Sequence, residues 1–128
     1  MHFVSWAAAY STITQGSSLS SAISERGLPC NVWRIDNRIS RTLGDKPKAK
    51  LPIGHYLREN FYITTSGNFR TQTLSEVMLE VGADRILYSV DYPFEDTGIA
   101  ADWFDHCAIS EADRVKIGHT NAAQLFRV

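Results

Sequence analysis

The stretch Arg85-Ile-Leu-Tyr-Ser-Val-Asp91-Tyr-Pro93 decides the fold of this chain. Residues 85–90 form a short and largely apolar run, which predicts a buried β-strand. The strand should end at Asp91, because aspartate and the following Tyr-Pro pair favour a turn. Helix-like and strand-like segments alternate on both sides of this stretch, so we expect it to be one strand of a parallel sheet.

A strand and two helices are predicted upstream of this stretch. Apolar residues recur on one helical face over residues 28–43, with Pro29 in the first turn and Gly44 as the stop. The aromatic and β-branched run 61–66 predicts a strand. The next helix has a capping-box signature, Thr73 with Glu76, and should end at Gly82; its apolar stripe is Leu74, Val77, Met78 and Val81.

The segments between these elements are expected to be irregular. The lysine- and proline-rich stretch 45–52 predicts an exposed connection, and the serine- and threonine-rich stretch 11–21 predicts a loop or a loosely held N-terminal tail. Downstream, three further helical segments are expected. They are an amphipathic helix from Ala100 to Cys107, a helix that Ser110 caps with Asp113 and Gly118 stops, and a last short helix from Asn121 to Phe126.

The resulting order of helices and strands is that of an α/β fold with parallel strands. Two or three strands are too few for a complete α/β sheet. A (β/α)₈ barrel needs eight strands and about 250 residues, roughly twice this chain. The pattern alone therefore predicts part of an α/β fold.

The bulk composition excludes several classes of protein. The chain has 128 residues with 44% hydrophobic and 21% charged residues, which is typical of one globular domain. Its net charge of -1 does not favour nucleic acid or anionic lipid as a partner. Neither a signal peptide nor a membrane span is predicted, and Cys30 and Cys107 have no CxxC partner. We therefore expect a soluble cytoplasmic protein with reduced cysteines.

Asp91 is the residue whose position most suggests chemistry. In an α/β barrel, a residue at the C-terminal end of a strand points into the mouth of the active site. A carboxylate there, without a neighbouring lysine or arginine, needs a metal ion or a proton to offset its charge. A turn-forming or helix-capping aspartate is an equally good interpretation on position alone.

The other candidate groups favour ordinary structural roles. The four histidines, His2, His55, His106 and His119, form no HxH or HExxH pair, so the sequence contains no local metal-ligand set of the usual kind. The remaining basic candidates lie on the predicted helix 28–43, opposite its apolar face; they are Arg34, Arg38 and Arg41. A solvated face is the usual role of such a stripe, although an arginine near a binding site can also grip a carboxylate.

Several short runs of the sequence occur together in an order that resembles one enzyme family. They are Gly27–Pro29, Trp33–Arg38, Glu59–Gly67, Gly82–Leu87, Ser89–Glu95, Lys116-Ile117 and Asn121–Ala123. Together they resemble the C-terminal part of the amidohydrolase-related decarboxylases that act on 2,3-dihydroxybenzoate, γ-resorcylate and salicylate-type acids. The resemblance covers residues 25–128 and leaves residues 1–24 as an unmatched N-terminal segment.

This resemblance implies a fold, a cofactor and three site residues. The fold is the C-terminal portion of a (β/α)₈ TIM barrel of the metal-dependent hydrolase type, and family members form dimers or tetramers. The cofactor is one divalent metal, zinc or manganese. Asp91 matches a metal ligand that is also proposed to protonate the ring carbon as CO₂ leaves. Phe94 matches an aromatic wall of the substrate pocket, and Arg34 matches an arginine near the substrate.

The chain also departs from the family pattern. The other metal ligands of the family lie upstream of the matching part. Where the family has a His-x-Gly-Glu run before Gly-Leu-Pro, this chain has Ile23 at the histidine position and Arg26 at the glutamate position. A catalytic zinc normally has three protein ligands, so Asp91 alone should not hold one tightly. We expect a chain that is truncated or altered ahead of residue 25.

Three functions therefore stand as hypotheses. The first is a decarboxylase of hydroxylated aromatic acids that is inactive as this isolated chain. The second is a non-catalytic assembly module or pseudoenzyme, and the third is a hydrolase or hydratase of the same superfamily. The run Ser89–Glu95 favours the decarboxylase branch. The expected partners are a small aromatic carboxylic acid and further copies of the chain or another chain, because a partial barrel exposes a strand edge.

Overall fold

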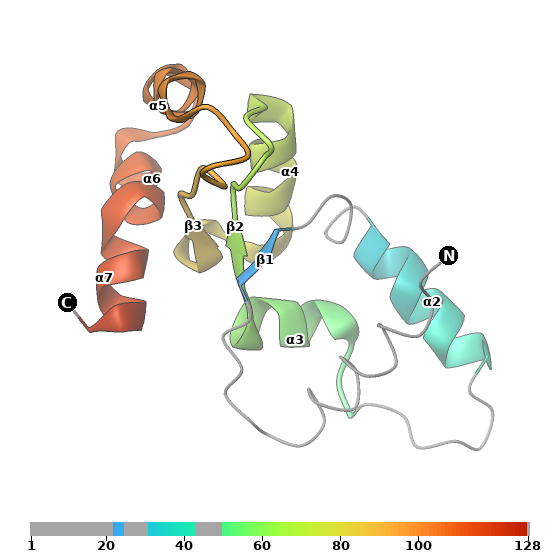
Figure 1. Ribbon diagram of the computed structural model, residues 1–128. Helices are drawn as coiled ribbons and strands as arrows, with labels where there is room; N and C mark the ends of the chain where they lie inside the picture. The colour runs from blue at the N-terminus through green and yellow to red at the C-terminus, as the bar shows by residue number, and fades with distance from the viewer. Residues whose placement is uncertain (1–21, 25–30, 43–49, 128) are drawn as a thin grey trace.

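The computed structural model describes residues 22–24, 31–42 and 50–127, and it contains one parallel sheet (Figure 1). The strands are β1 (Ala22–Ser24), β2 (Tyr62–Thr64) and β3 (Ile86–Leu87), in the spatial order β1-β2-β3. In the central strand, Ile63 pairs with Ile23 on one side and with Ile86 on the other. The predicted α/β class is therefore confirmed.

Helical segments link and follow these strands. They are α2 (Val32–Thr42), α3 (Ile53–Asn60), α4 (Thr71–Val81), the 3₁₀ turn η2 (Ala83–Arg85), α5 (Thr97–His106), α6 (Glu111–Val115), the π-helical turn η3 (Lys116–Thr120) and α7 (Asn121–Phe126). Helix α2 packs on α3, which packs on α4. The segments α6, η3 and α7 form one column beside β3, while α4 lies beside β2 (Figure 1).

The hydrophobic core lies where β2 and β3 meet these helices. Both residues of β3 are buried, so both faces of this strand are covered, as is usual for parallel sheets. Ile86 of β3 and Ile117 of η3 are the largest fully buried side chains in the described ranges. Partly buried side chains, among them Tyr88 and Trp103, pack against the cluster. Its other buried members are Val32, Ile53, Leu57, Phe61, Ile63, Leu74, Val77, Val81, Phe104 and Cys107. Cys107 is buried with a free thiol.

Most predicted elements are present; the two strands are shorter than expected, α4 and α5 begin earlier, and α7 has the predicted bounds. The helix expected over 28–43 is α2, and the positions of Pro29 and Gly44 lie outside the described residues. The strands expected over 61–66 and 85–90 are β2 and β3. Gly82 ends α4 with a φ of 81°, a left-handed conformation that glycine adopts without strain.

Helix α3 and strand β1 were not predicted. Helix α3 has no capping side chain of its own, because the Asp36 carboxylate on α2 accepts a hydrogen bond from the Ile53 amide at 2.7 Å. A carboxylate is favourable at a helix N-terminus, but this cap comes from a different helix and leaves no local signal. Strand β1 also has no local signal, because it is held by pairing with β2, a distant part of the chain. The loop or tail predicted for 11–21 lies outside the described residues.

Two predicted boundary signals are wrong and one is confirmed. Helix α4 begins at Thr71, so Thr73 lies inside it and forms no capping box; the Trp103 indole donates to the Thr71 hydroxyl at 3.3 Å. Gly118 does not stop a helix, because η3 continues from α6 into α7. The Ser110 cap is confirmed, since its hydroxyl accepts from the Asp113 amide at 3.1 Å. In the part of the chain that the structure describes, no helix has the length and apolarity needed to cross a membrane.

Candidate functional site

Asp91 lies just beyond the C-terminal end of β3, as the sequence predicted. Its backbone is in the left-handed region with a φ of 79°. Its carbonyl accepts hydrogen bonds from the Phe94 amide at 2.9 Å and the Glu95 amide at 3.3 Å. This turn is made by the backbone, so the chain reverses without using the Asp91 carboxylate.

The Asp91 carboxylate is exposed at this edge of the sheet. Within the described ranges it accepts no hydrogen bond, and helix α5 is capped by Asp96, whose carboxylate accepts from the Ile99 amide at 2.9 Å. The capping interpretation of Asp91 is therefore wrong. The turn interpretation holds for its backbone, and the side chain is left for another role.

A group of hydroxyls lies at the same end of the sheet. The Thr64 hydroxyl bonds to that of Ser66 at 3.2 Å, and Ser66 bonds to Ser89 at 2.9 Å. The Thr65 hydroxyl donates to the Ser89 carbonyl at 2.8 Å and accepts from the Ser89 amide at 3.0 Å. These bonds fix the ends of β2 and β3 relative to each other and so position Asp91. Sequence reasoning missed them, because serine and threonine at strand ends are too common to stand out.

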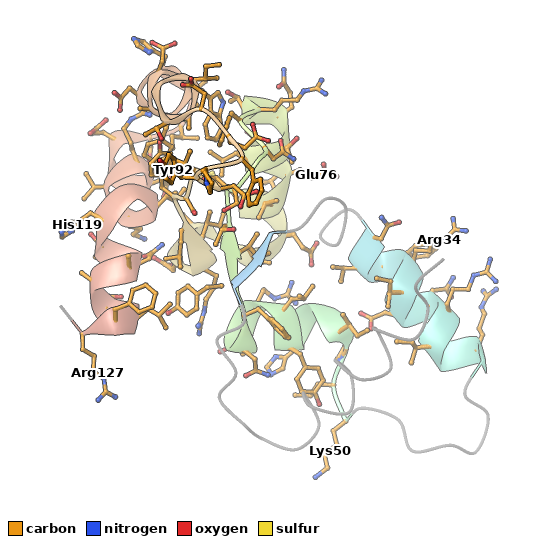
Figure 2. The ribbon with its side chains drawn as sticks, viewed as in Figure 1. Arg34, Lys50, Glu76, Tyr92, His119 and Arg127 are labelled. Carbon is orange, nitrogen blue, oxygen red and sulfur yellow. The ribbon has the colours of Figure 1, made fainter. Side chains whose placement is uncertain are left out.

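Aromatic side chains are exposed next to Asp91. Tyr92 is 80% exposed and Phe94 is 84% exposed, and Figure 2 shows Tyr92 on the loop between β3 and α5. Large apolar groups exposed together indicate a surface that is covered in a larger assembly or by a ligand. Phe94, which was expected to form an aromatic wall of the substrate pocket, thus lies on an open surface in this structure.

Arg34 is not brought to this surface. It is exposed on α2, well separated from Tyr92 (Figure 2). Arg38 and Arg41 of the same helix are also exposed, which agrees with a solvated face. The structure therefore does not join Arg34 to Asp91 within one chain.

The residues present do not fit a divalent metal by themselves. No group of three or more His, Cys, Asp or Glu side chains in the described part of the chain is arranged to hold a metal ion. His106 bonds to the Asp102 carbonyl at 2.7 Å, and His55 packs edge-on against Tyr56. Both histidines thus have local structural contacts, as expected. His2 lies outside the described residues.

Tyr88 immediately follows β3 and is a titratable group near this site whose pKa is shifted. Its ring stacks on Phe104 with centroids 4.5 Å apart. Burial raises the pKa of the Tyr88 hydroxyl, and the Asp105 carboxylate raises it further. The phenol is therefore held neutral as a packing group and is not activated as a base.

Known proteins resemble this chain in sequence. The amidohydrolase family model matches residues 43–128. A γ-resorcylate decarboxylase from Polaromonas sp. strain JS666 is 58% identical over 104 residues, which are 80% of this chain and 32% of that protein. The chain thus spans about a third of the length of the curated relatives that it matches.

Solved structures resemble it in fold. A 2,6-dihydroxybenzoate decarboxylase complexed with 2,6-dihydroxybenzoate matches with a TM-score of 0.71 at 55% identity, over 80% of this chain and 32% of that one. A dihydroxybenzoic acid decarboxylase from Polaromonas sp. JS666, with bound manganese and the inhibitor 2-nitroresorcinol, matches with a TM-score of 0.72 at 58% identity, over 79% and 31%. The predicted partial (β/α)₈ barrel is therefore confirmed.

Proposed function

The chain belongs to the amidohydrolase family, and from this premise we propose that it supplies one part of a metal-dependent, non-oxidative decarboxylase of hydroxylated aromatic acids. The observation that carries the proposal is its 58% identity to a γ-resorcylate decarboxylase over 104 residues. The aligned part includes the strand end at which Asp91 is exposed. The proposed reaction breaks the bond between a ring carbon and its carboxylate, releases CO₂ and places a proton on the ring carbon.

Each proposed site residue has a distinct role. Asp91 is the carboxylate that this chain contributes to a metal site and the group that delivers the proton. Phe94 forms an aromatic wall against the substrate ring. Arg34 binds the substrate carboxylate, and its separation from Tyr92 means that it serves a site assembled from more than this single chain (Figure 2). The hydroxyls of Ser66 and Ser89 keep the strand end that precedes Asp91 in place.

The isolated chain is proposed to be inactive. The described residues lack the cluster of ligands that a metal needs, and the exposed Asp91 has no ligand partner among them. The native metal, manganese or zinc, is therefore bound only when the rest of the barrel is present. Manganese is favoured, because the Polaromonas relative was crystallised with it. The proposed setting is the cytoplasm, with further copies of the chain or a second polypeptide as partner.

A non-catalytic assembly module is the second candidate. It is favoured by the same lack of a metal-ligand cluster in the described residues and by the exposed apolar surface around Tyr92 and Phe94. The two candidates differ in one property. A catalytic part restores activity when the missing part of the barrel is supplied, and a pure assembly module does not.

Complementation tests the proposal. The chain is co-expressed with the Polaromonas decarboxylase from which the matching C-terminal third has been removed, and resorcinol formation from 2,6-dihydroxybenzoate is measured with Mn²⁺. We expect activity only in the combined sample. D91N should lower the rate by about 10²–10⁴-fold, the usual contribution of a proton-transferring group.

A matched aspartate variant controls for the loss of charge. Asp105 is exposed on α5 and has no role in the proposed reaction, so D105N should leave the rate unchanged. A stable complex without activity would favour the assembly module. Equal rates for D91N and the unmodified chain would remove Asp91 from the reaction.

A further inference from the structure

The backbone pairing of β2 with β3 ends at Thr65. In a parallel sheet, a residue that donates its amide to the neighbouring strand offers its carbonyl to the residue two positions further along that strand. The Thr65 amide donates to the Leu87 carbonyl at 3.1 Å. The regular pattern would then join the Thr65 carbonyl to the Ser89 amide, but this carbonyl accepts from the Asn68 amide at 3.0 Å instead. Thr65 thus gives its carbonyl to the turn that leaves β2.

The Thr65 hydroxyl takes the place of this carbonyl. It accepts from the Ser89 amide at 3.0 Å and donates to the Ser89 carbonyl at 2.8 Å. Thr65 is only 6% exposed, so both bonds are shielded from competing water. Because a side-chain oxygen stands between the two backbones, the chain after β3 is held farther from β2 than a continued ladder would hold it.

The position of Asp91 depends on this spacing. In the described ranges no hydrogen bond holds the Asp91 carboxylate itself, so the backbone places it. The backbone turns at Asp91 with a φ of 79°, and the Phe94 amide closes the turn by donating to the Asp91 carbonyl at 2.9 Å. Ser89 lies two residues before this turn, and its backbone is tied to Thr65. The contact between Thr65 and Ser89 therefore fixes where the turn begins.

We propose that Thr65 is the positioning residue for Asp91 in the decarboxylation, because its hydroxyl sets the distance between the ends of β2 and β3. The part that concerns the reaction rests on the proposed function, whereas the part that concerns the turn rests on the structure alone. Ser66 has a lesser effect, since its hydroxyl bonds to the Ser89 side chain at 2.9 Å and not to the Ser89 backbone. Thr65 acts through Asp91 and not on the substrate.

Replacing Thr65 by valine isolates the hydroxyl. T65V puts a methyl group of similar size in its place and removes both bonds to Ser89. The ladder can then continue by one step, with the Ser89 amide competing against the Asn68 amide for the Thr65 carbonyl. This step would draw the chain after β3 toward β2 and carry Asp91 with it.

Amide hydrogen exchange of the chain alone, followed by NMR, tests the position of the turn without any reaction. In T65V the Phe94 amide should lose protection and exchange several-fold faster than in the unmodified chain. The Tyr88 amide should keep its rate, because it donates to the Ile117 carbonyl and not to β2. T65S keeps the hydroxyl, so both of its rates should match those of the unmodified chain.

The same variants, in complex with the truncated Polaromonas decarboxylase, test the effect on the reaction. Loss of a contact behind a metal ligand typically costs about 10–100-fold in activity. With saturating Mn²⁺ and 2,6-dihydroxybenzoate, T65V should therefore lower kcat by about 10–100-fold and leave KM nearly unchanged. T65S should retain nearly the full kcat.

A matched threonine variant controls for the loss of a buried or half-buried hydroxyl. The Thr120 hydroxyl on η3 bonds to the Val115 carbonyl at 3.4 Å, so T120V also removes a bond from a hydroxyl to the backbone. It should leave kcat and the Phe94 exchange rate unchanged. If T65V does not fold, as judged by circular dichroism, T65A and T65S replace the comparison, because they differ by the hydroxyl alone.

Three results would overturn the proposal. The Phe94 amide could exchange in T65V as slowly as in the unmodified chain, or together with an equally accelerated Tyr88 amide, which would show general loosening. T65S could lose as much kcat as T65V. The loss in T65V could also lie in KM instead of kcat. An inactive complex of the unmodified chain would contradict the proposed function instead, and the exchange rates of Phe94 would still decide on Thr65.

Discussion

Replacing Arg114 by methionine should strongly destabilise the chain, because this side chain ties α6 to the end of α5. Its guanidinium donates to the Phe104 carbonyl and, at 2.8 Å, to the Cys107 carbonyl. It also lies over the Phe104 ring, 5.7 Å from the centroid, and its side chain is only 18% exposed. A cation at the C-terminus of a helix is favoured by the helix dipole.

The magnitude follows from these contacts. A hydrogen bond from a charged donor contributes roughly 1.5–3 kcal/mol. Both carbonyls keep another donor in R114M, since the Ile109 amide bonds to Cys107 and the Cys107 thiol bonds to Phe104. The lower end of the range therefore applies to each bond. We expect a loss of about 3 kcal/mol in the free energy of unfolding, and a fall in Tm of roughly 10–20 °C.

Thermal and urea unfolding followed by circular dichroism provide the assay. In R114K the lysine ammonium keeps the charge but cannot hydrogen-bond to both carbonyls at once. R114K should therefore lose about half as much stability as R114M. E111Q is the matched control. It removes the ion pair between Glu111 and Arg114, and the Glu111 side chain is 80% exposed. It should change stability by less than about 0.5 kcal/mol. An R114M variant as stable as E111Q would refute the reasoning.

Two further predictions concern the packing around Phe104. Burial raises the folded-state pKa of Tyr88, so the stability that this group contributes is complete below its ordinary pKa of about 10 and is lost as the pH rises through the folded-state value. Y88F should therefore lose less stability than the unmodified chain as the pH rises above the ordinary tyrosine pKa of about 10, and equal losses in urea titrations would contradict this. A Cβ at Gly118 would lie 3.1 Å from the Phe104 ring, which is held by stacking on Tyr88 and cannot easily yield. G118A should thus cost about 1 kcal/mol, after allowing for the better helix propensity of alanine, and a rise in Tm would count against it.

The features that sequence predicted correctly are those with a local cause. The strand before Asp91 was predicted because an apolar run ending in Asp-Tyr-Pro is a short-range pattern. Ser110 was identified as a helix cap because its partner, Asp113, is three residues away. Gly82 ends α4 for the same kind of reason, since its left-handed φ of 81° is a property of that residue alone.

The features that sequence missed depend on distant partners. Helix α3 is capped by Asp36 from another helix, so its start has no local signal. Helix α7 begins at Asn121 as predicted, but the bonds from the Asn121 side chain to the backbone of β3 were not predicted. Gly118 was predicted to stop a helix, whereas it allows η3 to approach Phe104 closely. In each case the contact that was missed is with a residue distant in sequence, which no local pattern shows.

The candidate site divides in the same way. The position of Asp91 at a strand end follows from its neighbours in sequence, and the structure places it there. The hydrogen bond between the Ser66 and Ser89 hydroxyls forms only when the two strands lie side by side, so no sequence pattern predicts it. The roles of Arg34 and Phe94 depend on parts of a barrel beyond this chain, and they stay predictions.

The central claim is that Asp91 is one ligand of a metal site whose other ligands lie outside this chain. Metal content measured after dialysis tests this claim most directly. The chain alone, and its complex with the truncated Polaromonas decarboxylase, are loaded with Mn²⁺, dialysed and assayed by mass spectrometry. We predict no retained manganese in the chain alone, one ion per complex, and loss of that ion with D91N but not with D105N. One ion retained by the chain alone, or by the D91N complex, would contradict the claim.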